Sequence, residues 1–393
     1  MRSEPRPWPE GFAPGRSGRD SVLVLASLAG LLPRKVAETA RREGTASACL
    51  RAVRAGELGS DMDRVMADRI DPREVEASLR RCGARLVAPG DAEYVLGLDH
   101  LADPPAALFV RGRSLLELEP RVAVVGARIC SPLGRDVATE LGSGLAAAGI
   151  AVVSGGARGI DGASHRGALQ AGGPTIAVSG CGIDTAYPTQ HGGLIERIAA
   201  TGAVVSEYPP GVPAQPFRFP ARNRIIAALA EAVVVVEGAA GSGSLITADH
   251  ALDLGRPVYA VPGPVNSELA EVPLALVREG AGMVRNSADL LADLGHLDPT
   301  AGTHDGAAAS LSVPERAVWD ALRSPTLPEQ LSGATGLELR DVLSVLVDLE
   351  LRGLVRTVGG RAERRLLERP ATMEVIPGRI DPDRAPAGEG PAG

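Results

Sequence analysis

Glycines and arginines gather where short apolar runs end in this sequence, and together they can bind an anion. The first run ends in Gly126, Ala127 and Arg128. Backbone N–H groups at a strand-to-helix turn, with the positive end of the helix dipole, favour a phosphate beside such an arginine. The turn is not the dinucleotide fingerprint, because glycine is missing from the second and third required positions. A turn glycine with an incidental surface arginine is the alternative interpretation.

A second glycine-rich segment follows the second apolar run. It consists of Ser154, Gly155, Gly156, Ala157, Arg158, Gly159, Ile160 and Asp161. Its glycines would let the backbone approach a phosphate closely. Asp161 is predicted to be the N-cap of the next helix. No acidic residue ends the run at the position where a dinucleotide-binding protein holds its ribose.

The densest basic cluster has aromatic residues between its arginines. Arg218, Arg222 and Arg224 fall within seven residues, and Phe217 and Phe219 stand among them. Arginines contact phosphates, and aromatic rings or guanidinium planes stack on bases. The candidate contact residues from this cluster are Phe219, Arg222, Asn223 and Arg224. Ordinary solvated arginines are the alternative.

Small and hydroxyl residues follow the fifth apolar run, in the segment 241–248. Ser242, Gly243, Ser244 and Thr247 are the candidate contact residues of this turn. Such residues at the start of a helix suit a phosphate or a closely packed chain. A plain N-cap would need only one of them.

Several classes of enzyme and metal site are excluded by residue type. Lys35 is the only lysine and lies in a helical stretch, so neither a P-loop nor a Schiff-base lysine is possible. No G-x-S-x-G nucleophile elbow occurs. The histidines and the four cysteines lack metal-ligand spacing. We therefore expect no catalytic residue, no metal and no cofactor.

The composition indicates a cytoplasmic protein. No apolar run approaches the roughly 18 residues of a membrane span, and residues 1–20 lack the apolar core of a secretory signal. Scattered cysteines fit a reducing compartment. The formal net charge of −7 argues against a broadly basic nucleic-acid-binding surface, so any such site must be a local patch.

From residue 121 onwards, short β-branched runs alternate with helix-length segments. The runs are 122–126, 150–156, 174–180, 202–208, 231–238 and 256–263. Runs that are apolar throughout are typical of parallel strands covered on both faces. The pattern predicts an α/β fold with a Rossmann-like, doubly wound, mostly parallel sheet, whose ligands would bind at the carboxyl ends of the strands.

The remaining segments predict smaller domains around this sheet. Residues 20–85 show helical periodicity, and 314–367 read as three helices and a hairpin, the order of a winged helix. The predicted organisation is a disordered N-terminus (1–19), a helical domain with transition strands (20–104), a Rossmann-like domain (105–295), a linker (296–312), a winged helix (313–367) and a disordered tail (368–393).

The motifs VGAR, SGGARGIDGASHRGAL, FPARNRIIAAL, GSGSLITADHAL and GRPVYAVPG, in this order and spacing, resemble the DprA/Smf family over about residues 105–290. The resemblance implies a non-catalytic homodimer that binds single-stranded DNA and loads the recombinase RecA onto it, in natural transformation and recombination. Its implied phosphate-binding elements are Gly126 to Arg128, Ser154 to Gly159, Arg222 with Arg224, and Ser242 to Thr247.

The sequence departs from the family pattern in two places, and two other functions are alternatives to the one that the resemblance implies. Glu271, Val272 and Pro273 replace a glycine-containing segment near the family's dimer and partner surface, and the N-terminal region lacks a clear glycine hairpin. A phosphoribohydrolase is disfavoured because Thr247 stands near the place of its catalytic glutamate. The other alternative is a regulator that senses a nucleotide and reads duplex DNA with its winged helix.

Overall fold

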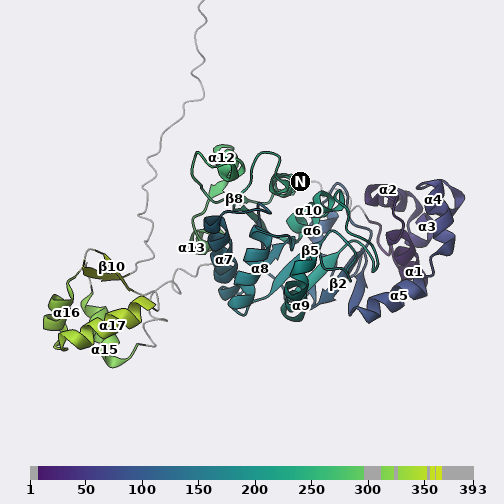
Figure 1. Cartoon of the computed structure of the whole chain (residues 1–393). Helices are drawn as coiled ribbons and strands as arrows, with labels where there is room; N and C mark the ends of the chain where they lie inside the picture. Colours follow the sequence, from purple (N-terminus) through teal and green to yellow (C-terminus); the bar gives the residue numbers. More distant parts are fainter. Residues whose placement is uncertain (1–7, 296–310, 323–325, 352–354, 359, 365–393) are drawn as a thin grey trace, which may run out of the picture. The chain divides into compact units, whose positions relative to one another are not determined.

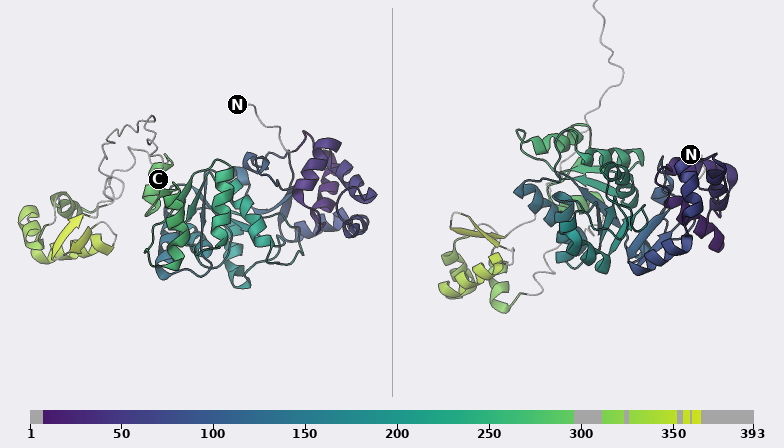
Figure 2. Two further views of the ribbon diagram at one scale, coloured as in Figure 1. Left: turned by 90° about the horizontal axis from the view of Figure 1, so that it is seen from above. Right: turned by 45° about the vertical axis from the view of Figure 1, so that its right-hand side comes forward.

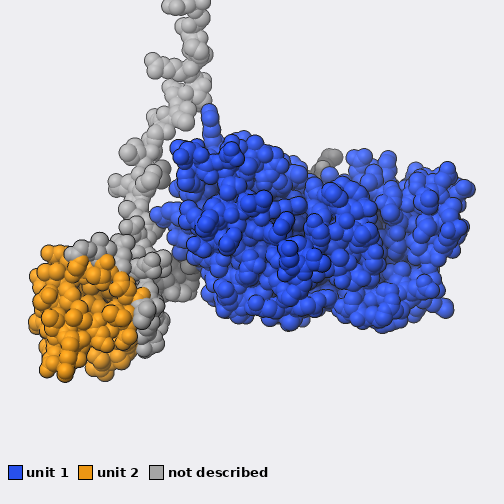
Figure 3. Space-filling view, viewed as in Figure 1, with its two compact units in different colours: residues 1–298 blue, residues 299–393 orange. Residues whose placement is uncertain are grey.

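The computed structural model describes residues 8–295, 311–322, 326–351, 355–358 and 360–364. The chain forms two compact units, residues 1–298 and 299–393, which Figure 3 colours separately. In the part of the chain that is described, no helix is long and apolar enough to cross a membrane.

A nine-stranded sheet is the centre of the first unit, with the strand order β1-β2-β6-β5-β4-β3-β7-β8-β9. The strands are β1 (Ala84–Val87), β2 (Leu108–Gly112), β3 (Arg121–Val125), β4 (Ala151–Ser154), β5 (Thr175–Ser179), β6 (Ala203–Ser206), β7 (Ala232–Val235), β8 (Val258–Ala260) and β9 (Gly282–Met283). The strands from β3 to β9 pair in parallel, whereas β2 is antiparallel to both β1 and β6. The predicted mostly parallel, doubly wound sheet is confirmed.

Alternate residues of β3, a central strand of the sheet, pack into two separate hydrophobic cores. Val122 and Val124 belong to one cluster of buried residues, while Ala123 and Val125 belong to the other. Successive side chains of a strand point to opposite faces of the sheet. This is why residues 122–125 of the strand are all apolar and why their sequence shows no alternation.

Helices cover both faces of the sheet (Figures 1 and 2). They are α7 (Pro132–Ala147), α8 (Ile160–Gln170), α9 (Gly192–Thr201), α10 (Arg218–Leu229), α11 (Gly243–Asp253), α12 (Glu271–Arg278) and α13 (Ser287–Asp293), with α6 (Leu96–Asp99) and the short 3-10 turns η1 (Leu115–Glu117), η2 (Thr189–His191) and η3 (Glu268–Ala270). α7 contacts α8 and α8 contacts α9, while α10 packs against α11. Right-handed crossovers place α7 to α9 on one face and α10 and α11 on the other, because the strand order reverses direction after β6.

Glycines allow α7 and α8 to approach each other backbone to backbone. A Cβ on Gly142 would lie 2.1 Å from the carbonyl oxygen of Ser164, and one on Gly167 would lie 2.1 Å from that of Thr139. Any larger residue at either position would therefore force the two helices apart.

Five short helices precede the sheet: α1 (Gly15–Ala26), α2 (Pro33–Glu43), α3 (Ala46–Ala55), α4 (Asp61–Arg69) and α5 (Pro72–Arg81). The expectation that residues 1–19 are disordered is wrong for the described part, because α1 begins at Gly15. Trp8 and Phe12 are buried with ring centroids 4.6 Å apart, and the Trp8 indole N–H donates to the Tyr94 hydroxyl at 3.2 Å. These two aromatic residues tie the segment to the core.

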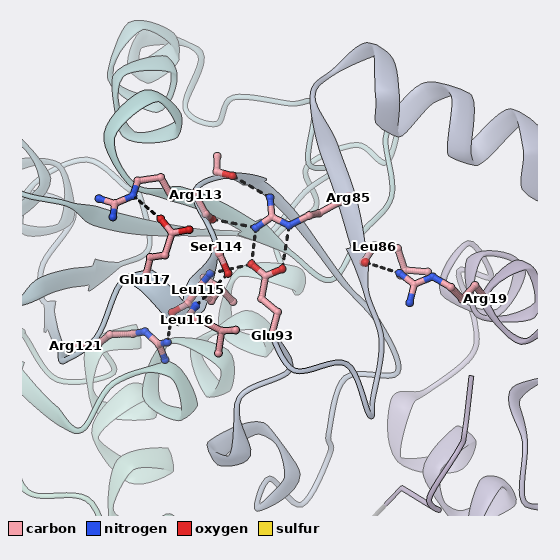
Figure 4. Close-up of polar contacts among 11 residues, drawn as sticks. Arg19, Arg85, Leu86, Glu93, Arg113, Ser114, Leu115, Leu116, Glu117 and Arg121 are labelled. Carbon is pink, nitrogen blue, oxygen red and sulfur yellow. Dashed lines mark hydrogen bonds and ion pairs between the residues drawn. The ribbon is translucent and has the colours of Figure 1, made fainter. Parts of the chain in front are cut away.

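The transition strands β1 and β2 belong to the central sheet and connect it to the helices (Figure 4). Arg19 of α1 donates to the carbonyl oxygen of Leu86 at 2.8 Å. Arg85 of β1 pairs with Glu93, which also accepts the backbone N–H of Leu115 at 2.8 Å. Burial raises the pKa of Glu93, but the hydrogen bonds from Arg85, Leu115 and Ser114 and the charge of Arg85 together outweigh this effect, so the pKa lies below its ordinary value. The predicted domain boundary between residues 104 and 105 therefore falls between β1 and β2, two strands that pair in one sheet.

The second unit contains α15 (Val313–Ala321), α16 (Pro328–Thr335), α17 (Leu339–Leu351), and the antiparallel strands β10 (Val355–Val358) and β11 (Arg361–Arg364). Val318, Trp319, Leu331, Leu346 and Val355 form part of its core. This is the predicted order of three helices and a hairpin. Most of the predicted linker (residues 296–310) and the predicted tail (368–393) lie outside the described residues.

We expect Gly142→Ala to lower the free energy of unfolding by about 1–3 kcal/mol, because the added methyl group overpacks the α7–α8 contact. Urea denaturation measures the change. Gly193→Ala on α9 is the matched control, since nothing lies within 4 Å of its Cβ position, and it should shift stability by less than about 1 kcal/mol. Equal stability of the two variants would contradict the proposed close approach.

Candidate functional site

The neighbouring strands β3 and β7 end at the topological switch point of the sheet, where α/β folds bind their ligands. A cavity of about 420 Å³ opens there. Its lining includes nine of the predicted site residues: Gly126, Arg128, Phe219, Arg222, Asn223, Ser242, Gly243, Ser244 and Thr247. Residues from three distant parts of the sequence thus meet in one place.

The start of α11 forms the polar wall of this cavity. Ser242 is the N-cap, and its hydroxyl accepts the N–H of Ser244 at 3.3 Å. The Asn223 amide donates to the carbonyl oxygen of Gly243 at 2.9 Å, which attaches α11 to α10. The first-turn N–H groups of a helix have no partner within the helix and carry its positive partial charge. This wall favours an anion.

Arg128 and two aromatic rings lie together at the edge of the cavity. The guanidinium carbon of Arg128, an exposed residue, lies 5.4 Å from the ring centroid of Phe219. The Phe219 ring in turn lies 4.8 Å from the ring of Tyr187, which is 48% exposed. A cation beside aromatic faces suits a phosphate next to a stacked base. Sequence reasoning missed Tyr187, because only the fold brings it close to Phe219.

Arg222 is buried under the cavity and bonded to the ends of two strands. Its guanidinium donates to the carbonyl oxygens of Gly155, at 2.6 Å, and of Val178. Burial lowers the pKa of Arg222 to about 10, although the carboxylate of Asp161 opposes the shift. Arg222 is therefore still charged at neutral pH. Its charge makes the electrostatic potential of the cavity more positive from beneath the cavity surface, and its side chain is not free to move towards a ligand.

Asp161 has a different role from the predicted one. It is the second residue of α8, whose N-cap is Gly159, and its carboxylate accepts the N–H of Ala157 at 3.3 Å. Burial raises the pKa of Asp161, and the positive charge of Arg222 counteracts this shift. The carboxylate thus balances the buried arginine and holds the glycine-rich turn.

The predicted arginine cluster is divided between two sides of α10. Arg222 and Arg224 are two residues apart, so their side chains point in nearly opposite directions around a helix of 3.6 residues per turn. Arg224 lies away from the cavity, where it pairs with Glu207 at 2.7 Å and donates to the Asp103 carbonyl oxygen at 2.7 Å. The structure does not bring Arg224 into the predicted site.

The second glycine-rich turn supports the cavity from behind. The Ser154 hydroxyl is buried and donates to the carbonyl oxygen of Val124 at 2.7 Å. Gly155 packs on the Arg222 guanidinium, and Gly159, with φ of +73°, fits beneath the carbonyl oxygen of Ala127. Ala127, Gly156 and the exposed Arg158 likewise lie outside the cavity lining.

A carboxylate of the chain itself occupies the first strand-to-helix turn. Glu237, at the end of β7, accepts the N–H of Ser131 at 2.9 Å and also its hydroxyl, at the N-terminus of α7. The N–H of Ala127 donates to the Glu237 carbonyl oxygen at 2.8 Å. The N–H groups of Ala127 and Ser131 are therefore already bonded within the protein and are not available to a phosphate. Gly126 and Arg128 of the same turn still line the cavity.

The departure at residues 271–273 lies beside the loop that precedes α11. The carboxylate of Glu271 accepts the N–H of Ala240 at 2.9 Å, and the N–H of Val272 donates to the Gly238 carbonyl oxygen at 2.9 Å. These bonds tie the start of α12 to the loop that carries the polar wall. Among the described residues, no group of three histidine, cysteine, aspartate or glutamate side chains could hold a metal.

Comparison with known proteins gives consistent matches over both units. A family model described as DNA recombination-mediator protein A matches residues 85–295, and one described as the DprA winged helix domain matches residues 303–361. A DprA relative from Mycobacterium tuberculosis is 40% identical over 333 residues, which cover 79% of this chain and 85% of that protein. The protein Smf of Escherichia coli is 38% identical over 284 residues, covering 69% and 75%.

A solved structure agrees with these matches. The crystal structure of DNA processing protein A from Streptococcus pneumoniae aligns with a TM-score of 0.62 and 34% identity, and the alignment covers 71% of this chain and 98% of that one.

Removal of the buried guanidinium should damage the fold. We expect Arg222→Met to lower the free energy of unfolding by about 3–5 kcal/mol, because it leaves the Asp161 carboxylate buried without its partner. Chemical denaturation measures the loss. Arg128→Met is the matched control: it removes the same group from an exposed position and should change stability by less than about 0.5 kcal/mol. Parent-like stability of Arg222→Met would show that Arg222 has no structural role.

Proposed function

The chain belongs to the DprA/Smf family of DNA-processing proteins, and on that premise we propose that it binds single-stranded DNA in the cavity between β3 and β7. The observation that carries the proposal is the position of Arg128 beside the Phe219 ring at the edge of this cavity. A phosphate can pair with the guanidinium while the adjoining base stacks on an aromatic face.

A single strand fits this arrangement better than a duplex. The base faces of a duplex are already stacked on each other, so they cannot reach the Phe219 and Tyr187 rings. The polar wall at the start of α11 offers N–H groups and hydroxyls to one phosphate at a time. The net charge of −7 disfavours non-specific attraction to DNA, so affinity has to come from this local arrangement.

The proposed function is binding without catalysis. Asp161 is a carboxylate of the cavity lining, but it accepts the N–H of Ala157 and its charge is offset by the buried Arg222. The Thr247 hydroxyl, near the place of a phosphoribohydrolase glutamate, donates to the Gly243 carbonyl oxygen at 3.5 Å. Neither residue offers a free acid or base to a bound nucleotide.

Three further parts of the proposal rest on membership of the family. The protein acts in the cytoplasm, it loads RecA onto the bound strand during transformation and recombination, and it works as a homodimer. The edge of the sheet at β9 supports a subunit contact, because Met283 is 54% exposed on this strand and Val265, in the loop after β8, is 91% exposed. Sedimentation tests the dimer, and RecA filament assembly on strands covered by a single-strand-binding protein tests the loading.

The direct test compares labelled single-stranded and double-stranded oligonucleotides of one sequence, about 20 nucleotides long, at matched salt. We expect clearly tighter binding of the single strand in a gel-shift assay. Equal or tighter binding of the duplex would contradict the proposal. It would favour instead a regulator that reads duplex DNA with its winged helix.

Arg128→Ala should weaken single-strand binding about 10- to 150-fold, because one charge-assisted phosphate contact is worth about 1.5–3 kcal/mol. The fold should stay intact, since Arg128 is exposed. Fluorescence anisotropy with an oligonucleotide measures the affinity. Arg41→Ala, at an exposed position of α2, is the control and should change little. A folded Arg128→Ala protein with parent affinity would mean that the strand binds elsewhere.

A further inference from the structure

A second cavity, of about 210 Å³, lies between the helical domain and the sheet. One side is formed by the end of α1, the loop that follows and the start of α2. The other side includes Tyr208, Phe217, Arg218 and Ala221. None of the predicted site residues except Arg224 lines it, and the proposed function makes no use of it.

Arg218 is a buried group of this cavity with an unused hydrogen-bond donor. Its side chain is 6% exposed, its Nη1 donates to the Pro213 carbonyl oxygen at 2.6 Å, and its Nε has no hydrogen-bond partner. Leaving a buried donor unsatisfied is costly, and such groups are rare in folded proteins. The Nε has almost no accessible surface, so Arg218 borders the cavity through its other atoms.

Aromatic rings flank this guanidinium. Its carbon lies 4.7 Å from the ring centroid of Tyr208 and 5.5 Å from that of Phe217. Phe217 is 65% exposed. Rings and a guanidinium plane offer stacking surfaces for a flat heterocycle.

The charges around the cavity are balanced. Arg218 and Arg224 are opposed by Glu207 and Asp103, and Arg224 is within 2.7 Å of Glu207. The rest of the lining is mostly apolar, including Leu28. A phosphate would meet two carboxylates here, whereas a neutral base with carbonyl or ring-nitrogen acceptors would not.

The two cavities share the first turns of α10. Phe219 and Arg222 of this helix line the cavity at β3 and β7, while Phe217, Arg218 and Ala221 line the second one. They are thus separated by about the width of one helix, on the order of 10 Å. Phe217, the N-cap residue of α10, is exposed.

We propose that this second cavity receives a base of the same DNA strand whose backbone is bound beside Arg128, with the base packed against the Tyr208 or Phe217 ring. The inference rests on the proposed single-strand binding and extends it: bases, not only phosphates, contribute to affinity, and the helical domain forms part of the DNA site.

The test fills the cavity from the side of the helical domain. Ala29 lines it and is exposed, so Ala29→Trp can place an indole into the cavity without replacing a core residue. Ala55→Trp, at an exposed position at the end of α3, is the matched control. The probes are an oligothymidylate of about 20 nucleotides and an abasic strand of the same length.

Ala29→Trp should bind oligothymidylate about 5- to 100-fold more weakly than the parent, the range expected when one stacked base is lost. Its affinity for the abasic strand should equal that of the parent, and Ala55→Trp should match the parent with both probes. Parent-like binding of oligothymidylate by Ala29→Trp overturns the inference alone, and would leave the cavity to a protein partner. If the parent fails to bind oligothymidylate at all, the proposed function falls and the inference with it.

A second measurement does not depend on the folding of any variant. Oligonucleotides that carry 5-iodouracil are irradiated with the parent protein, and the cross-linked peptides are mapped by mass spectrometry. Cross-links at Tyr208, in addition to those at Phe219 or Tyr187, support the inference. Cross-links confined to Phe219 and Tyr187 overturn it while leaving the proposed function in place.

Discussion

The site depends on one buried guanidinium. Arg222 bonds to backbone carbonyl groups at the ends of β4 and β5 and is balanced by Asp161 on α8. A buried charge is tolerated only when its hydrogen bonds and its counter-charge are supplied. Because both are supplied here, α10 is held across the carboxyl ends of the strands. Asn223 and Arg224 add further attachments of α10, to α11 and to Glu207.

The chain neutralises some of its positive groups with its own carboxylates. It leaves other positive groups free to bind a ligand. Glu237 occupies the N-terminus of α7, and Glu207 neutralises Arg224. Among the described contacts, no carboxylate pairs with Arg128 or with the first turn of α11, and Asp161, a carboxylate of the cavity lining, lies beside Arg222 instead. A protein of net negative charge can thus present one small attractive surface for a polyanion.

The helix α10 separates two environments of different chemistry. On one face it contributes to a polar cavity with an anion-favouring wall, and on the other it borders an apolar cavity with balanced charges. A nucleotide has the same division, since its phosphate is charged and its base is flat and neutral. Phe217 to Arg224 form little more than two helical turns, so both parts of one short strand segment can be accommodated along them.

The sequence by itself determined the sheet, the two kinds of flanking domain and most of the residues at the switch point, because apolar β-branched runs, glycine turns and helix periodicity are local signals. Tertiary structure alone decided which of these residues face the cavity. It directed Arg224 and Arg222 to different sides of α10 and bonded the N–H of Ser131, at the start of α7, to Glu237. It also brought Tyr187 next to Phe219. These outcomes depend on contacts between residues up to 121 positions apart, which no local pattern encodes.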